Sequence, residues 1–153
     1  MDNTFDFLVG TWHVASRRLT TRLAGSDDWA EFPGESTCVR VWDGAANFDQ
    51  ISFPTKGYAG LTLRLYDPGR DEWSLYWASS RDGLLGLPPV VGRFGPDGTG
   101  AFFADELYEG QPIRVRYLWD NITATTARWA QAFSPDGERT WETNWIMDFT
   151  RKS

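Results

Sequence analysis

The chain contains few of the residues that most often carry catalysis or bind metal ions. Its 153 residues include one histidine, His13, and one cysteine, Cys38. These counts exclude an intrachain disulfide and any zinc site built from several cysteines or histidines. A Ser-His-Asp relay would have to use His13, and the sequence Gly-x-Ser-x-Gly does not occur. We therefore expect no bound metal ion and no conventional nucleophile-base pair.

Clustered basic residues and long apolar runs are also scarce. Fifteen Lys and Arg residues stand against 21 Asp and Glu residues, giving a net charge of -6. Nucleic-acid binders present basic patches, and here the only basic pairs are Arg17-Arg18 and Arg151-Lys152. No apolar stretch approaches the ~18 residues of a membrane-spanning helix, and residues 1-8 lack the features of a secretory signal. We expect one cytoplasmic domain over residues 1-153 that binds neither nucleic acid nor membranes.

Tryptophan, by contrast, is abundant, with nine residues in short segments where apolar and polar side chains alternate. A period of two is typical of β-strands, and Pro-Gly and Pro-Asp-Gly sequences at residues 68, 96 and 135 mark turns. A short helical turn is predicted within residues 2-9. Strands are predicted at residues 11-23, 29-42, 47-53, 57-67, 72-79, 88-94, 99-109, 111-121, 126-134 and 141-151. This spacing favours a β-sandwich or β-barrel.

Strand register decides which side chains face inward. In the last hairpin, pairing Phe133 with Trp141 would place Gln131 opposite Thr143 and Trp129 opposite Trp145. The hairpin around Asp67 has two alternatives. A five-residue loop, which the hydrophobic pattern prefers, places Leu63, Leu65, Leu75 and Trp77 on one face and Arg64 outside. A four-residue loop instead sets Arg64 beside Leu75, so this register stays open.

The two ends of the chain resemble the calycin arrangement of lipocalins and fatty-acid-binding-like barrels. There a Gly-x-Trp on the first strand seals the barrel base, and an arginine of the last strand stacks on the indole. Gly10, Trp12 and Arg151 match these positions. Segments such as Trp73-Ser-Leu-Tyr-Trp also resemble bacterial lipocalin-like proteins of the domain-of-unknown-function family 1579. The resemblance implies an all-β, closed, up-and-down antiparallel barrel of about ten strands, and it brings no activity with it.

Some ten-stranded barrels related to nitrobindins bind haem through a histidine late in the chain, where this sequence has none. His13 follows Trp12 on the opposite strand face and is expected to point to solvent, so we predict no cofactor. Arg114 and Arg116 are expected on the exterior, because Ile113, Val115, Tyr117 and Trp119 form the better inward face. Arg18 shares a face with Trp12 and is the best candidate for an internal charge. Asp105, Glu106 and Glu109 fit a solvated acidic segment better than a general acid or base.

The predicted function is binding of a hydrophobic or aromatic small molecule. Two alternatives stay open: an isomerase or cyclase acting through one tyrosine or carboxylate, and a filled barrel that acts as an oligomeric interaction protein. The apolar segment around Leu84, Leu85 and Leu87 is expected either to cover the barrel mouth or to form a homodimer contact. Besides Arg18, the predicted pocket residues are Trp77, Tyr117, Trp119, Trp129, Gln131, Thr143, Trp145 and Met147.

Overall fold

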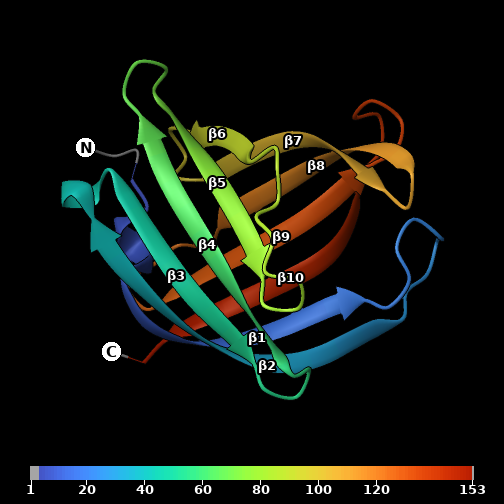
Figure 1. Ribbon diagram of the computed structural model, residues 1–153, viewed down its shortest axis with the longest axis horizontal. Coiled ribbons are helices and arrows are strands. Elements are labelled where there is room, and N and C mark those ends of the chain that lie inside the picture. Colours follow the sequence, from blue (N-terminus) through green and yellow to red (C-terminus); the bar gives the residue numbers. More distant parts are fainter. Residues whose placement is uncertain (1–3, 153) are drawn as a thin grey trace.

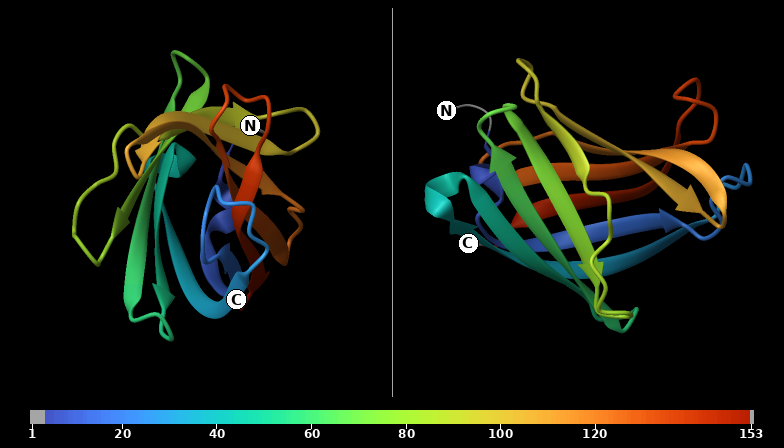
Figure 2. Two further views of the ribbon diagram at one scale, coloured as in Figure 1. Left: turned by 90° about the vertical axis from the view of Figure 1, so that its right-hand side faces the viewer. Right: turned by 45° about the horizontal axis from the view of Figure 1, so that its top comes forward.

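The computed structural model describes residues 4–152 and shows a closed antiparallel β-barrel of ten strands (Figures 1 and 2). Each strand pairs with its neighbours in the chain, and β1 pairs with β10 to close the ring. The all-β, up-and-down fold expected from the sequence is therefore confirmed. The strands are β1 (Gly10–Leu19), β2 (Trp29–Val41), β3 (Ala46–Phe53), β4 (Tyr58–Asp67), β5 (Glu72–Ser79), β6 (Val90–Phe94), β7 (Gly100–Tyr108), β8 (Gln111–Asp120), β9 (Thr126–Ser134) and β10 (Glu142–Arg151).

Two short 3-10 turns, η1 (Asp6–Leu8) and η2 (Trp42–Gly44), complete the secondary structure of residues 4–152. The helical turn predicted within residues 2-9 corresponds to η1, although residues 2 and 3 lie outside the described part. β1 ends at Leu19 rather than at residue 23, because Leu23 and Gly25 adopt positive φ angles in the following loop. We call the end of the barrel that carries η1 and both termini the base, and the opposite end the mouth (Figure 1).

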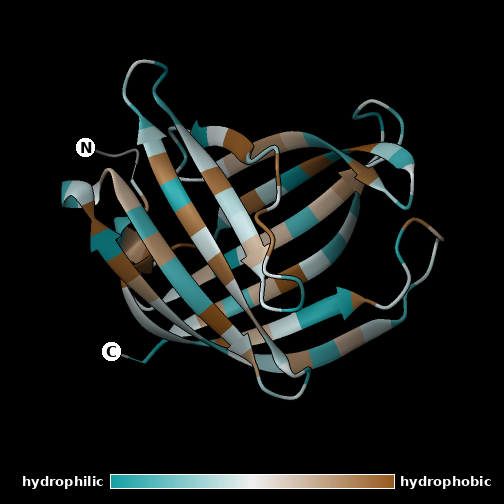
Figure 3. Cartoon of the chain, in the orientation of Figure 1, coloured by the Kyte–Doolittle hydropathy of each residue, from teal (hydrophilic) through white to brown (hydrophobic). Residues whose placement is uncertain are grey.

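Side chains alternate between the interior and the exterior along most strands (Figure 3). On β1 the buried positions are Trp12, Val14 and Ser16, and the exposed ones between them are His13 and Ala15. A strand that separates water from an apolar interior requires this period of two. The interior at the base is filled with aromatic rings. Phe5 contacts Trp73, Phe94, Phe102 and Trp119 there, with ring centroids 4.9–6.2 Å apart.

The register predicted for the β9–β10 hairpin is wrong. Phe133 pairs with Glu142 and Gln131 pairs with Trp145, because Asn144 forms a β-bulge in β10. A regular ladder continued from Phe133 and Glu142 would turn Asn144, Ile146 and Asp148 toward the interior. The bulge inserts one residue and returns Trp145, Met147 and Phe149 to the inner face. Asn144 itself is buried, and its Oδ1 accepts a hydrogen bond of 2.9 Å from Gln131 Nε2.

The β4–β5 hairpin adopts the four-residue loop, so the alternative preferred by hydrophobic pattern is wrong. Arg64 pairs with Leu75, Tyr66 pairs with Trp73, and residues 68–71 form the loop. The Asp67 carboxylate caps this loop by accepting hydrogen bonds from the Gly69 and Arg70 amides. The pattern misleads because the inward Arg64 is compensated by polar partners on β3. The outward leucines of β4 are then partly exposed on the barrel surface.

Candidate ligand-binding cavity

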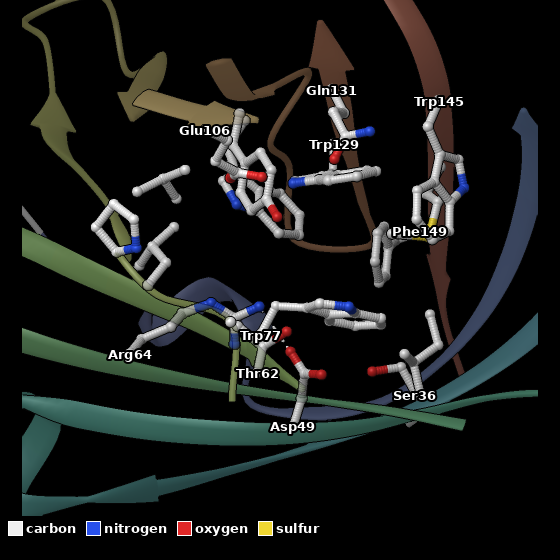
Figure 4. A pocket seen from close by; sticks show the side chains of 18 of the residues that line it. Ser36, Asp49, Thr62, Arg64, Trp77, Glu106, Trp129, Gln131, Trp145 and Phe149 are labelled. Carbon is white, nitrogen blue, oxygen red and sulfur yellow. Dashed lines mark ion pairs between the residues drawn. The ribbon is translucent and has the colours of Figure 1, made fainter. Parts of the chain in front are cut away.

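The barrel interior is not completely filled. A cavity of about 230 Å³ lies between the packed base and the mouth (Figure 4). Its walls come from most strands of the barrel and from residues 86–88, which precede β6. The residues that line it are Ser36, Asp49, Ile51, Thr62, Arg64, Leu75, Trp77, Gly86, Leu87, Pro88, Val90, Glu106, Tyr117, Trp119, Trp129, Gln131, Phe133, Trp145, Met147 and Phe149.

The structure brings most of the predicted pocket residues together around this cavity. Seven of them line it: Trp77, Tyr117, Trp119, Trp129, Gln131, Trp145 and Met147. Their aromatic rings meet edge to face. Trp129 lies 5.1 Å from Tyr117 and 5.3 Å from Trp145, centroid to centroid, with interplanar angles of 73° and 87°. Such T-shaped contacts stabilise aromatic clusters beyond the area they bury, and here they form a wall of ring faces and edges.

Thr143 and Arg18 do not line the cavity. Thr143 pairs with Ala132 on the mouth side of the Asn144 bulge, so the hydrogen-bonding position expected for it is taken by the bulge residue. Arg18 points inward but lies nearer the mouth. Its Nη1 donates a 2.9 Å hydrogen bond to the Tyr58 hydroxyl, and its Cζ lies 4.7 Å from the centre of the Trp145 ring. Trp145 thus lines the cavity, and the guanidinium of Arg18 stacks on its ring.

A buried ion pair occupies the β3–β4 side of the cavity. Arg64 Nη2 lies 2.6 Å from Asp49 Oδ2, and Arg64 Nη1 donates a 3.0 Å hydrogen bond to Asn47 Oδ1. Only 4% of the Arg64 side chain and 10% of the Asp49 side chain are exposed. The guanidinium also lies 5.2 Å from the centre of the Phe5 ring. Charges removed from water in this way need such partners, because an unpaired buried charge is costly.

Glu106 lies on the opposite wall of the cavity from this ion pair (Figure 4). It stands on the same face of β7 as the buried Phe102 and Ala104, so the alternation directs it inward at the mouth end. Burial by the surrounding protein raises the pKa of its carboxyl group above the ordinary value. Burial is also the main reason that the pKa of Tyr117 is raised, with a further contribution from the Glu106 charge. Glu106 is exposed, as expected of a solvated carboxylate, and it also forms part of the cavity wall.

The segment between β5 and β6 forms part of the cavity wall at the mouth. Gly86 N donates a 2.8 Å hydrogen bond to Trp77 O, and Leu85 forms a β-bridge with Ala78. These contacts hold Gly86, Leu87 and Pro88 against the cavity. Leu87 and Pro88 also border a groove on the outside of the barrel, which Glu106 lines as well. The segment therefore covers the cavity beside an opening at Glu106. At least half of the surface of Leu84, Leu85 and Leu87 is exposed to solvent. A homodimer contact through these leucines stays a prediction.

The barrel base has the arrangement that the calycin resemblance implies. Arg151 pairs with Trp12 across β1 and β10, and its Cζ lies 4.2 Å from the centre of the indole. Its Nη1 and Nη2 donate to the carbonyls of Val9 and Phe7 at 2.6 and 2.7 Å. Gly10, at the start of β1, has a φ of 121°, a backbone angle that favours glycine. These contacts close the base under the cavity.

The remaining charged candidates lie on the exterior, as expected. His13 is exposed, and its Nδ1 lies 3.1 Å from Glu35 Oε1. Arg114 pairs with Asp105 at 3.2 Å on the outer face of the barrel. Arg116 stacks over the Trp141 ring at 4.4 Å. None of these five titratable side chains lines the cavity, so the site contains none of the exterior ion pairs.

The charged residues that line the cavity are Asp49, Arg64 and Glu106. The sequence analysis did not name Asp49, left the inward position of Arg64 open, and expected Glu106 in a solvated segment. One signal was present in β3, where Asn47 and Asp49 alternate with the outward Phe48 and share a face with Ile51. Polar residues on a strand's apolar face indicate a buried partner of opposite charge. Arg64 could be recognised as that partner only with the β4 register, which depends on one residue of loop length.

No protein-family profile matches the chain, and no curated protein matches it in sequence. Within residues 4–152, no cluster of three or more His, Cys, Asp or Glu side chains could hold a metal ion. No helix in the same residues is long and apolar enough to cross a membrane. Evidence on function therefore comes from the cavity itself.

Proposed function

We propose that the protein is a lipocalin-like barrel that binds a small, largely apolar molecule in its central cavity. The observation that supports this is the cavity itself, because aromatic side chains surround a volume that no side chain occupies. Protein interiors are close-packed, and voids larger than a water molecule are few. An unfilled volume lined by Trp77, Trp119, Trp129 and Trp145 leaves apolar surface without packing partners. A ligand would supply those contacts.

The size of the cavity limits the ligand. An apolar cavity of about 150 Å³ accommodates benzene, and the present cavity of about 230 Å³ is roughly one and a half times as large. We therefore expect a compact molecule of one or two rings rather than a long-chain lipid. Few polar groups with many ring contacts are the usual composition of a small-molecule site. The ring edges and faces of Tyr117, Trp129 and Trp145 favour a flat or aromatic ligand.

The direct test is calorimetric titration with a neutral aromatic such as 2-phenylethanol, using the full chain. We expect binding that quenches tryptophan fluorescence, because the ligand would contact the indoles of the wall. Leu75 lines the cavity and is buried, so Leu75→Phe should fill part of the volume and abolish or strongly weaken binding. Leu63→Phe makes the same chemical change on the outward face of the neighbouring strand and should leave binding intact.

Native mass spectrometry of freshly purified protein complements this titration. A retained mass that disappears on denaturation, and is absent from the Leu75→Phe variant, would support the proposal and report the ligand's class. Absence of binding by neutral aromatics together with a ligand-free mass would refute it. We also propose a cytoplasmic location, which rests on the sequence features above.

A further inference from the structure

Among the described residues that line the cavity, Arg64 is the one cation; both of its terminal nitrogens are engaged, and its buried Nε has no hydrogen-bond partner. Of the residues that line the cavity, Asp49, Arg64 and Glu106 carry charges. Arg64 directs one terminal nitrogen at Asp49 and the other at Asn47. Its guanidinium stacks near the rings of Phe5 and Trp119. An anionic ligand would have to displace Asp49, a buried carboxylate at 2.6 Å, to reach the Nη2 of Arg64, and the Nε is buried away from solvent. The cavity is therefore poorly suited to a carboxylate.

Glu106 is the charged group that stays available. In residues 4–152 its carboxylate has no hydrogen bond and no ion pair. Its neighbour Asp105 provides the contrast, since it points outward and pairs with Arg114. Glu106 stands where the cavity meets the outer groove, so a ligand entering there passes it. The Glu106 side chain is partly exposed to solvent, yet the protein around it raises the pKa of its carboxyl group, and an incoming cation would favour the charged form.

The aromatic wall reinforces this preference. The faces of indole and phenol rings carry negative potential, so they attract a cation that lies within about 6 Å of the ring centre. Trp129, Tyr117 and Trp119 line the cavity together with Glu106. A cavity that combines a carboxylate at its opening with ring faces further in is suited to a ligand with an ammonium group, because both components favour positive charge. With Asp49 and Arg64 cancelling each other, the cavity keeps one negative charge.

We propose that the ligand is a small organic cation, a primary or substituted amine attached to a ring. Its ammonium group binds the Glu106 carboxylate, and its ring lies among the indoles of the cavity. This inference rests on the proposed binding function and adds the chemical class of the ligand. The amine remains protonated throughout, so binding requires no transfer of a group or of electrons.

The experiment is a calorimetric titration at neutral pH with three ligands of one skeleton: 2-phenylethylamine, 2-phenylethanol and phenylacetate. The amine should bind about ten-fold or more tightly than the alcohol, as expected for a charge-assisted hydrogen bond. The acid should bind more weakly than the alcohol. Glu106→Gln should lower the affinity for the amine to about that for the alcohol, so that the preference for the amine disappears.

Asp105→Asn is the matched control, because it removes the same charge from the adjacent residue on the outer face. It should leave the preference for the amine intact. If the alcohol binds but the amine has no advantage, or if Glu106→Gln retains the advantage, the inference is wrong and the binding function stands. If none of the three ligands binds, the proposed function fails with it. Comparing the three ligands on the unmodified protein tests the preference for the amine even if the variants fail to fold.

Discussion

The buried ion pair makes a strong prediction about stability. Asp49→Asn replaces a carboxylate by an amide of nearly the same size and leaves the positive charge of Arg64 without its counter-ion. The two side chains are 10% and 4% exposed, and 2.6 Å separates Asp49 Oδ2 from Arg64 Nη2. The amide of the remaining Asn47 side chain cannot neutralise a guanidinium. The variant therefore keeps an uncompensated charge in the barrel interior, where its side chain is almost entirely removed from solvent.

Removing one partner of a buried pair typically costs about 3–5 kcal/mol of unfolding free energy. The substituted amide can still accept a hydrogen bond from Arg64, so we expect the lower end, about 3 kcal/mol. For a domain of this size, each kcal/mol lowers the Tm by about 2–4 °C, so the expected decrease is about 6–12 °C. Replacing both residues, as in Asp49→Asn with Arg64→Met, should recover part of the loss because no unpaired charge remains.

The assay is urea unfolding followed by tryptophan fluorescence, with the thermal midpoint as a second measure. Asp148→Asn is the control, since Arg128 Nε lies 2.7 Å from Asp148 Oδ1 but the two side chains are 38% and 41% exposed. An exposed pair contributes about 0–1 kcal/mol, so this variant should lose little stability. Equal losses at the two sites, or a loss below about 1 kcal/mol at Asp49, would refute the reasoning that burial makes the pair critical.

Three further predictions concern the cavity and the core. Glu106→Gln should raise the Tm slightly at neutral and higher pH and have little effect near pH 4. The carboxyl pKa is higher in the folded protein than in the unfolded chain, so the native protein loses stability as pH rises from the unfolded-state pKa through the folded-state pKa, by an amount reduced by the solvent exposure of Glu106. An opposite trend in Tm against pH would contradict this. Burial raises the pKa of the Cys38 thiol to about 11, so a thiol reagent at mildly alkaline pH should modify the native protein far more slowly than the unfolded chain, and equal rates would contradict this. Gly60→Ala should destabilise the protein by about 1–3 kcal/mol in urea, because the added Cβ collides with the Trp77 ring, and an unchanged midpoint would show that the ring can move aside.

The positions of the strands could be predicted because they depend on local signals, whereas closure into a barrel was implied by the calycin resemblance. Alternation on β1 and the turn sequence after Ser134 operate over a few residues, and a strand that must bury one face leaves little freedom. The same alternation placed Trp77 and Trp129 on the inner face. These are properties of single strands, so no knowledge of the partner strand was needed.

The polar part of the cavity could not be predicted, because it depends on how strands pair. The inward position of Arg64 follows from a loop one residue shorter than the hydrophobic pattern favoured. The exchange of Thr143 for the buried Asn144 follows from a bulge, which sequence alternation does not announce. In both cases a polar side chain enters the interior because a partner from a neighbouring strand satisfies it. Such compensation is a property of the assembled barrel.

The most direct test of the account is a crystal structure of the protein with a brominated aromatic such as 4-bromophenethyl alcohol, located by the anomalous scattering of bromine. We predict one internal bromine site, within contact of Trp129, Trp145 and Met147, in the volume of about 230 Å³. Leu75→Phe should remove this site. Bromine found only on the exterior of the barrel, or no bound ligand at concentrations that saturate fluorescence quenching, would contradict the claim that the cavity is the binding site.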